Sequence, residues 1–276
     1  MNLNSIKNNG QKGYTLVEIM VVIAIIGILS SVTFVAFSSA REKSRMSTAK
    51  MFEANQLVSI RNFLIAEWKL EEESGNTAYN SSNDNNGIFI EAPSWSNETY
   101  DSSSRKSLFF QFGSYLQLEQ TLGIMDTDFS ISMWIKTNIS TGQTYIINNT
   151  GSSLGYRFGI SGGKLGFLLG NGSYTETTCS TKRVDDDKWH HIAISFGREN
   201  KKVTCFIDGS ESGYKDLPSG YYGGSPEALT KIGSGYGKRY QGYVDNVRIF
   251  TSVLTASEIQ KLYVEELSQK KLAEAN

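Results

Sequence analysis

The chain has 276 residues, with 27 Lys and Arg against 28 Asp and Glu. This near balance gives no overall basic field for nucleic acid and no acidic tail, so it argues against a polyanion as partner. The length leaves room for a membrane span and one globular domain of ordinary size. With 26 Gly, 3 Pro, 14 Tyr and 14 Phe, we expect the globular part to be mostly β.

The first predicted element is an apolar run over residues 14–37, which contains a single charged residue, Glu18. A helix of roughly 20 apolar residues is long enough to cross a bilayer. An ionised side chain inside such a helix costs several kcal/mol unless something compensates it. A functional reason for Glu18 is therefore our first interpretation.

The start of this run resembles the N-terminus of a type IV prepilin. In that family a short basic leader ends in Gly, a prepilin peptidase cuts after it, and the new N-terminus is N-methylated. The resemblance implies a leader over residues 1–13, with cleavage between Gly13 and Tyr14. Tyr14 departs from the more usual Phe. The other positions that match the family pattern are Thr15, Leu16, Glu18 and Gly27.

The resemblance also implies how subunits assemble. The free amine of Tyr14 is positive, and Glu18 of a neighbouring pilin subunit in the same apolar layer would neutralise it, which sets the register of a helical filament. It implies a single-pass protein of the inner membrane with a cytoplasmic N-terminus, which then enters an extracellular pilus or a periplasmic pseudopilus. The alternative is an ordinary signal anchor with a stray Glu. The count of Lys and Arg around the span also argues against this orientation, but we give the leader motif more weight.

Apolar residues continue at helical spacing beyond the span, and no Pro or Gly interrupts residues 28–70. We predict one helix over residues 14–66, with residues 14–37 as the membrane span.

The pattern then changes to a period of two. In residues 128–137, Phe129, Ile131, Met133 and Ile135 alternate with polar residues and Trp134, as in a strand. Similar runs predict a sandwich of two sheets; they cover residues 106–112, 114–119, 144–149, 156–160, 164–170, 173–180, 188–196, 202–209, 228–233 and 243–250. Thr255 and Glu258 form a capping box for a short closing helix, and residues 264–276 are expected to be a tail.

Residues 67–263 resemble a laminin G-like domain of the concanavalin A-like lectin and glucanase fold. Four pieces in order carry this resemblance: residues 68–87, 128–136, 185–209 and 240–263. The implied fold class is α+β, a long N-terminal transmembrane pilin helix followed by an all-β jelly-roll sandwich. Such domains mostly bind carbohydrate or protein, often with Ca²⁺.

Three candidate features follow in this domain. By resemblance, Ca²⁺ ligands would be Asn80, Asn83, Asp84 and Asp245; the alternative is an Asx-rich turn and an Asp that holds strand ends. Cys179 and Cys205 either form a disulfide in an oxidising exterior or are two buried thiols.

A ligand-binding surface would consist of exposed aromatic rings. In the alternative, half of the candidate rings cover the core of the sandwich instead. The candidate rings are Tyr214, Tyr221, Tyr222, Tyr236 and Tyr240.

We do not expect an enzyme. Glucan hydrolases of this fold carry alternating carboxylates along one strand. Residues 71–73 and 185–187 are instead consecutive acidic residues, which we interpret as solvent-exposed surface. Two His, at 190 and 191, are too few for a typical zinc site.

Two functions remain open. The first is a type IV pilus subunit, minor or at the tip, whose sandwich adheres to a glycan or protein. The alternative is a structural pseudopilin of a type II secretion system with no external ligand.

Overall fold

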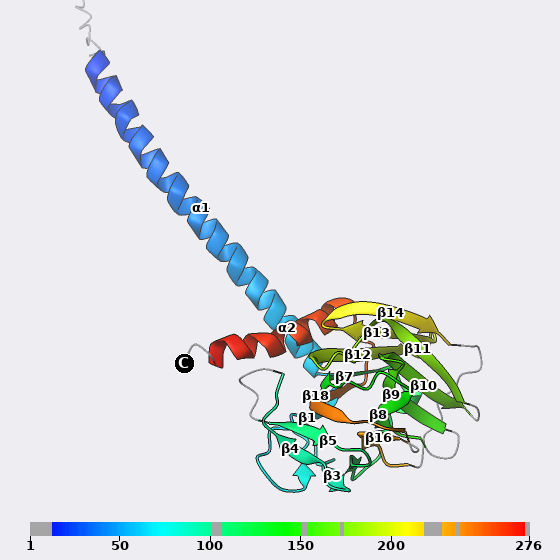
Figure 1. The fold of residues 1–276 in the computed structure, drawn as a ribbon. Coiled ribbons are helices and arrows are strands. Elements are labelled where there is room, and N and C mark those ends of the chain that lie inside the picture. The colour runs from blue at the N-terminus through cyan, green and yellow to red at the C-terminus, as the bar shows by residue number, and fades with distance from the viewer. Residues whose placement is uncertain are drawn as a thin grey trace, which may run out of the picture. The chain divides into compact units, whose positions relative to one another are not determined.

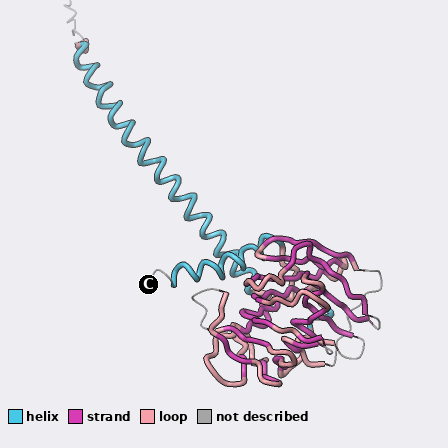
Figure 2. The backbone as a smooth tube through the Cα atoms, viewed as in Figure 1, coloured by secondary structure: helices cyan, strands magenta, loops and turns pink. Residues whose placement is uncertain are grey.

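The fold is that of a computed structural model, which describes residues 13–100, 106–150, 154–171, 174–217, 228–235 and 238–273. The chain divides into two compact units, Met1–Asn55 and Gln56–Asn276 (Figure 1). The first unit contains most of one helix, and the second contains the strands, which are magenta in Figure 2. The predicted division into a helical stem and a β domain is therefore confirmed.

Helix α1 spans Leu16–Arg61, so the prediction that it continues to residue 66 was wrong. Its last turn tightens where the N–H of Phe63 donates to the carbonyl of Ile60 at 3.1 Å. Strand β1 (Leu64–Trp68) then pairs antiparallel with the last strand of the domain. This tertiary pairing overrides a helical pattern that contains no breaker.

Sheet A follows the order β14-β13-β12-β7-β18-β5-β4, and β1 pairs with β18 beside this path. Its strands are β14 (Ser210–Asp216), β13 (Lys202–Ile207), β12 (Trp189–Gly197), β7 (Phe129–Lys136), β18 (Gly242–Phe250), β5 (Ser107–Phe110) and β4 (Ser94–Ser96).

Sheet B follows the order β11-β10-β9-β8-β15-β6-β3-β2, and the short strands β16 and β17 attach at β8. Its strands are β11 (Tyr174–Arg183), β10 (Lys164–Asn171), β9 (Leu154–Ser161), β8 (Gln143–Asn148), β15 (Lys231–Ile232), β6 (Tyr115–Leu118), β3 (Gly87–Ile90), β2 (Thr77–Ala78), β16 (Ser234–Gly235) and β17 (Lys238–Arg239). A 3₁₀ turn, Ile124–Asp126, precedes β7.

The main core lies between the two sheets. The predicted inward face of β7 is confirmed, because Phe129, Ile131, Met133 and Ile135 all belong to this core. Each predicted strand run coincides with a strand of one of the two sheets. The predicted sandwich is therefore the observed fold.

The outer face of sheet A is covered as well. Helix α2 spans Ala256–Ala273, so most of the predicted tail is helical. Its residues Ile259 and Leu262 form a second core with Phe206, Phe250 and Ile60. For this reason Trp134, which sequence periodicity placed on the outer face of β7, is nonetheless buried.

Both hydrophobic cores lie within residues 56–276. Leu57 and Leu64 pack against the second core, so the domain includes the last turns of α1. A fragment that begins at Gln56 keeps every residue of both cores, and we expect it to fold on its own.

Candidate functional site

The predicted processing site lies at the start of α1. Residues 1–12 of the predicted leader lie outside the described residues, while Gly13 and Tyr14 are exposed just before the helix. A Cβ atom added at Gly13 would meet no atom within 4 Å. A side chain at this position would therefore have room in this structure.

Glu18 is part of a capping box with Thr15. The backbone N–H and Oγ1 of Thr15 each donate to Glu18 Oε2 at 2.9 Å, and the Glu18 N–H donates to Thr15 Oγ1 at 3.3 Å. This reciprocal arrangement satisfies two helix-start donors. A carboxylate has about four acceptor positions, so the cap leaves room for a further donor such as the amine of another subunit.

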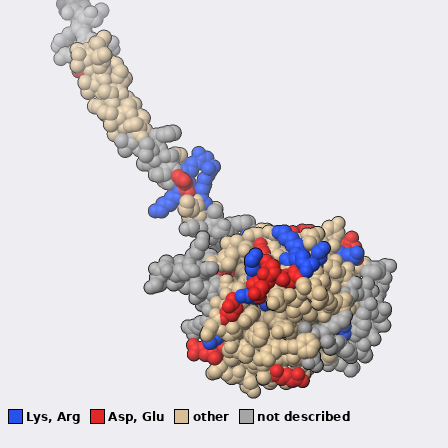
Figure 3. Space-filling model, in the orientation of Figure 1, with Lys and Arg blue, Asp and Glu red and all other residues tan. Residues whose placement is uncertain are grey.

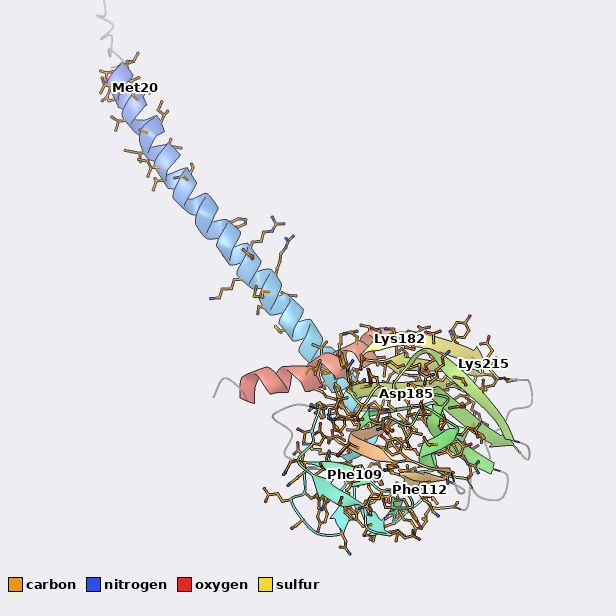
Figure 4. The ribbon with its side chains drawn as sticks, viewed as in Figure 1. Met20, Phe109, Phe112, Lys182, Asp185 and Lys215 are labelled. Atoms are coloured by element: carbon orange, nitrogen blue, oxygen red, sulfur yellow. A yellow bond between two sulfur atoms is a disulfide. The ribbon has the colours of Figure 1, made fainter. Side chains whose placement is uncertain are left out.

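The first turns of α1 expose apolar side chains on all sides. Met20 projects from the helix in Figure 4, and the exposed set comprises Leu16, Val17, Ile19, Met20, Val21, Val22, Ile23, Ile25, Ile26, Ile28 and Leu29. An apolar surface of this kind marks contact with other protein or with a membrane. Within the described residues, no helix is both long enough and apolar enough to cross a membrane.

Charged side chains follow the apolar part of α1. Arg41, Glu42, Lys43 and Arg45 are exposed, and they form the blue and red belt on the helix in Figure 3. On the described part of the β domain, Figure 3 shows acidic and basic side chains next to one another.

The predicted tyrosine surface is only partly described. Tyr214 is 54% exposed, and Lys202 Nζ lies 3.9 Å from its ring centroid. Tyr240 instead belongs to the main core, where its hydroxyl donates to the carbonyl of Tyr243 at 3.0 Å. Tyr221, Tyr222 and Tyr236 lie outside the described residues. Of the two predicted tyrosines that the structure describes, Tyr214 therefore has the exposure that the predicted role needs and Tyr240 does not.

Two of the four predicted calcium ligands, Asn80 and Asn83, already accept hydrogen bonds with their side-chain oxygens. Asn80 Oδ1 accepts the N–H groups of Glu67 and Ser82, and Asn83 Oδ1 accepts Asn80 Nδ2 and the Asn85 N–H. These bonds form an Asx-rich turn that joins the loop to β1. Asp84 is exposed, whereas Asp245 is fully buried in β18. Because the Asn oxygens already have donors, the geometry does not fit a Ca²⁺ ion.

Cys179 and Cys205 form a disulfide with a Cα–Cα distance of 5.8 Å. Cys179 lies in β11 of sheet B and Cys205 in β13 of sheet A. The bond therefore links the two sheets at one edge of the sandwich, and the predicted pairing is confirmed.

The two His have separate environments. His190 Nδ1 lies 2.9 Å from Asp208 Oδ2, and Nε2 lies 3.0 Å from Asp186 Oδ1. Hydrogen bonding to Asp208, assisted by Asp186, raises the pKa of His190. Burial lowers the pKa of His191 to about 3, since its ring is enclosed by Trp134 and Tyr263.

One row of polar side chains crosses the outer face of sheet B. Gln117 pairs with Lys231, Lys231 with Asn148, and Asn148 with Arg157. Directly paired residues point to the same face of a sheet. Asn148 and Arg157 are buried, so the accessible part of the row is Gln117 and Lys231, with Lys231 Nζ 4.7 Å from the Tyr115 ring centroid.

A charged pocket of about 190 Å³ lies beside β18, and of the described residues predicted as ligands it includes Asp245 alone. Arg248, one of its lining residues, bonds Glu67 Oε1 through Nε at 2.7 Å and Glu266 through Nη1. Glu266 also accepts the indole N–H of Trp134. Burial raises the pKa of Glu266 to about 7, although the Arg248 guanidinium acts against this rise. The acids come from β1 and α2, so only the fold brings them to Arg248.

Two known families match this chain, one in the β domain and one at the start of α1. Residues 110–260 match a laminin G family described as the concanavalin A-like lectin/glucanases superfamily. Residues 8–34 match the prokaryotic N-terminal methylation motif.

Similar curated sequences are pilins of Neisseria. A fimbrial protein of Neisseria meningitidis serogroup A is 32% identical over 87 residues, which cover 31% of this chain and 50% of the relative. The type IV major pilin protein PilE of Neisseria gonorrhoeae is 32% identical over 77 residues, 27% of this chain and 46% of the relative. The chain thus spans about half the length of these relatives.

Two solved structures are similar to this chain in fold. The binding domain of Paraclostridial Mosquitocidal Protein 1 has a TM-score of 0.60 at 18% identity, over 74% of this chain and 52% of the other. Domain 4 of AbnA, a GH43 extracellular arabinanase from Geobacillus stearothermophilus in complex with arabinotriose, has a TM-score of 0.58 at 17% identity, over 72% and 98%. At these identities the likeness shows the fold alone.

Proposed function

The chain belongs to the concanavalin A-like lectin/glucanases superfamily, and from this premise we propose that it is a type IV pilus subunit that displays its sandwich for adhesion to a glycan or protein. A prepilin peptidase cuts between Gly13 and Tyr14. The subunit is inserted in the inner membrane before assembly and then joins other pilin subunits in an extracellular filament. The proposed role involves no catalysis.

The observation that carries this proposal is the methylation motif over residues 8–34 on a helix with exposed apolar side chains. Such a helix needs a cover, and a membrane before assembly followed by neighbouring helices in a filament provides one. The β domain supports the adhesive part through its fold and through the accessible polar row on sheet B. A structural pseudopilin of a type II secretion system shares the helix but needs no ligand.

Processing is tested at Gly13. We expect Gly13→Leu to abolish cleavage, because the added side chain has room in the folded chain but occupies the position next to the cut bond. Mass spectrometry of the membrane-bound protein measures the N-terminus. Gly27→Leu is the matched control, since Gly27 also has open space around it, and it should be cut normally. Normal cleavage of Gly13→Leu would refute the prepilin assignment.

Assembly is tested at Glu18 with two variants. Gln at this position keeps a capping box but removes the charge, whereas Glu18→Ala removes both. We expect neither variant to give filaments in a shear preparation, while the exposed Glu42→Gln on the same helix does. If Glu18→Gln assembles like the natural protein and Glu18→Ala fails, the cap rather than the charge is what assembly requires.

Adhesion is tested with the fragment 56–276 on a glycan array and on host-surface proteins. We expect binding that survives the removal of calcium. An absence of hits on both arrays would refute the adhesive role and favour the secretion scaffold.

Calcium is left out of the proposed function, because the Asn oxygens serve the turn itself. Addition of calcium or EGTA should therefore leave the Tm of the fragment unchanged. A rise in Tm with calcium that both Asp84→Asn and Asp245→Asn remove would establish the site instead.

A further inference from the structure

The pocket beside β18 lies where this strand exchanges one neighbour for another. Its residues Gly242–Val244 pair with β5, and Val247–Phe250 pair with β1. Asp245 and Asn246 lie between these two ladders, and Asp245 pairs with Trp134 of β7. The register against β7 also shifts here, and Asn246 adopts a left-handed φ of 47°. Bulges and residues with such φ are concentrated at binding sites.

The diverging strands and α2 supply the walls of the pocket. β1 and the residues after it contribute Glu67, Lys69 and Glu71, the loop after β4 contributes Tyr100, and α2 contributes Leu262 and Glu265. At about 190 Å³ it is smaller than the roughly 300–1,000 Å³ of pockets for drug-sized ligands. It has room for about six water molecules at ~30 Å³ each. One sugar ring fits this space, and an oligosaccharide does not.

Asn246 provides an observation independent of the charges. It lines the pocket and is only 6% exposed, yet its Oδ1 accepts no hydrogen bond among the described residues. A buried acceptor without a donor is destabilising. A ligand with hydroxyl or amino donors would remove this destabilisation.

The charged side chains around the pocket indicate which ligand charge it would favour. Its lining contains four carboxyl side chains, those of Glu67, Glu71, Asp245 and Glu265, against three cationic ones. Of the cations, Arg248 bonds Glu67 at 2.7 Å and Arg61 bonds Glu265 at 2.8 Å. Glu71 is exposed at the rim. The surplus of acid favours a ligand with a positive group and disfavours an acidic sugar.

We infer that this pocket binds one terminal amino sugar of a glycan, with Asn246 accepting a hydroxyl or amino hydrogen and Glu71 facing the ammonium group. The inference rests on the proposed adhesive function and names its ligand class. The half-buried Tyr100 provides apolar surface for the sugar ring.

The test is ligand-observed NMR of the fragment 56–276 with glucosamine, glucose and glucuronate. We expect glucosamine to bind more tightly than glucose and glucuronate not to bind. Asn246→Gly removes the acceptor and suits the left-handed backbone, so it should weaken glucosamine about tenfold or more without loss of Tm. Glu71→Gln should make glucosamine and glucose bind equally. Phe112→Ala, at a site that is 69% exposed and outside the pocket lining, is the control.

The outcomes separate this inference from the proposed function. If glycan arrays give hits that Asn246→Gly and Glu71→Gln both retain, the pocket assignment fails and adhesion stands. Binding of glucuronate at the strength of glucosamine also overturns the assignment. If neither array gives a hit and no monosaccharide binds, both fall.

Discussion

Single residues in this chain have roles that depend on their hydrogen-bond partners. Glu18 and Glu258 both follow a Thr by three residues, and both form capping boxes with the same set of contacts. Sequence spacing predicted the second box. The first was interpreted only as an assembly charge, although the Thr15-to-Glu18 spacing carries the same signal. A capping box involves only four consecutive residues, so it can be predicted without knowledge of the tertiary structure.

His190 makes the stability of the β domain depend on pH. Its pKa is raised in the folded state, first through Asp208 and then through Asp186. Its contribution is therefore complete below the unfolded pKa of about 6.5 and is lost as pH rises through the higher folded value. We expect Tm to fall between about pH 6 and pH 8, and His190→Gln to flatten this change. An identical slope in the variant would contradict the assignment.

At the scale of elements, the disulfide and α2 make contacts between segments that are far apart in the sequence. The disulfide joins the two sheets, and α2 packs on the outer face of sheet A. The alternation in β7 identified its inward face correctly. It failed for Trp134, because an outer face is exposed only if no other element covers it. Helix α2 lies far from β7 in the sequence, so no pattern within the strand could reveal this cover.

The cross-sheet disulfide closes a loop with a sequence separation of 26. In the chain-entropy description, such a loop stabilises the fold by about 3.5 kcal/mol. The double variant Cys179→Ala/Cys205→Ala should lose about this much free energy of unfolding in guanidinium. Dithiothreitol should destabilise the natural protein by a similar amount and leave the double variant unchanged. If the reductant has no effect on the natural protein, the bond is not formed in solution.

Helix α2 is expected to contribute through its buried side chains. Ile259 is fully buried in the second core, so Ile259→Ala should cost about 2–5 kcal/mol of unfolding free energy. Val264 on the same helix is 50% exposed, and Val264→Ala should change stability by at most about 0.5 kcal/mol. Equal losses in the two variants, measured by chemical denaturation, would show that α2 is not docked on sheet A.

At the scale of the whole molecule, the boundary between stem and domain follows packing rather than periodicity. The predicted boundary at residue 66 falls inside β1, and it would remove Ile60 and Leu64 from the second core. We therefore expect a fragment 56–276 to unfold cooperatively and a fragment 66–276 to aggregate or melt at a lower temperature. Size-exclusion chromatography and thermal melts make this comparison. Equal behaviour of both fragments would mean that the last turns of α1 contribute nothing to the domain.

The sequence by itself determined the features that depend on neighbouring residues: the apolar helix with its motif around Gly13 and Glu18, the alternating strands and the second capping box. Tertiary structure decided the end of α1, the burial of Tyr240, whether the two cysteines pair, and the pocket at Asn246. Each of these depends on strands that meet from distant parts of the chain. Side-chain period reports which face a residue occupies, but it does not report which element lies against that face.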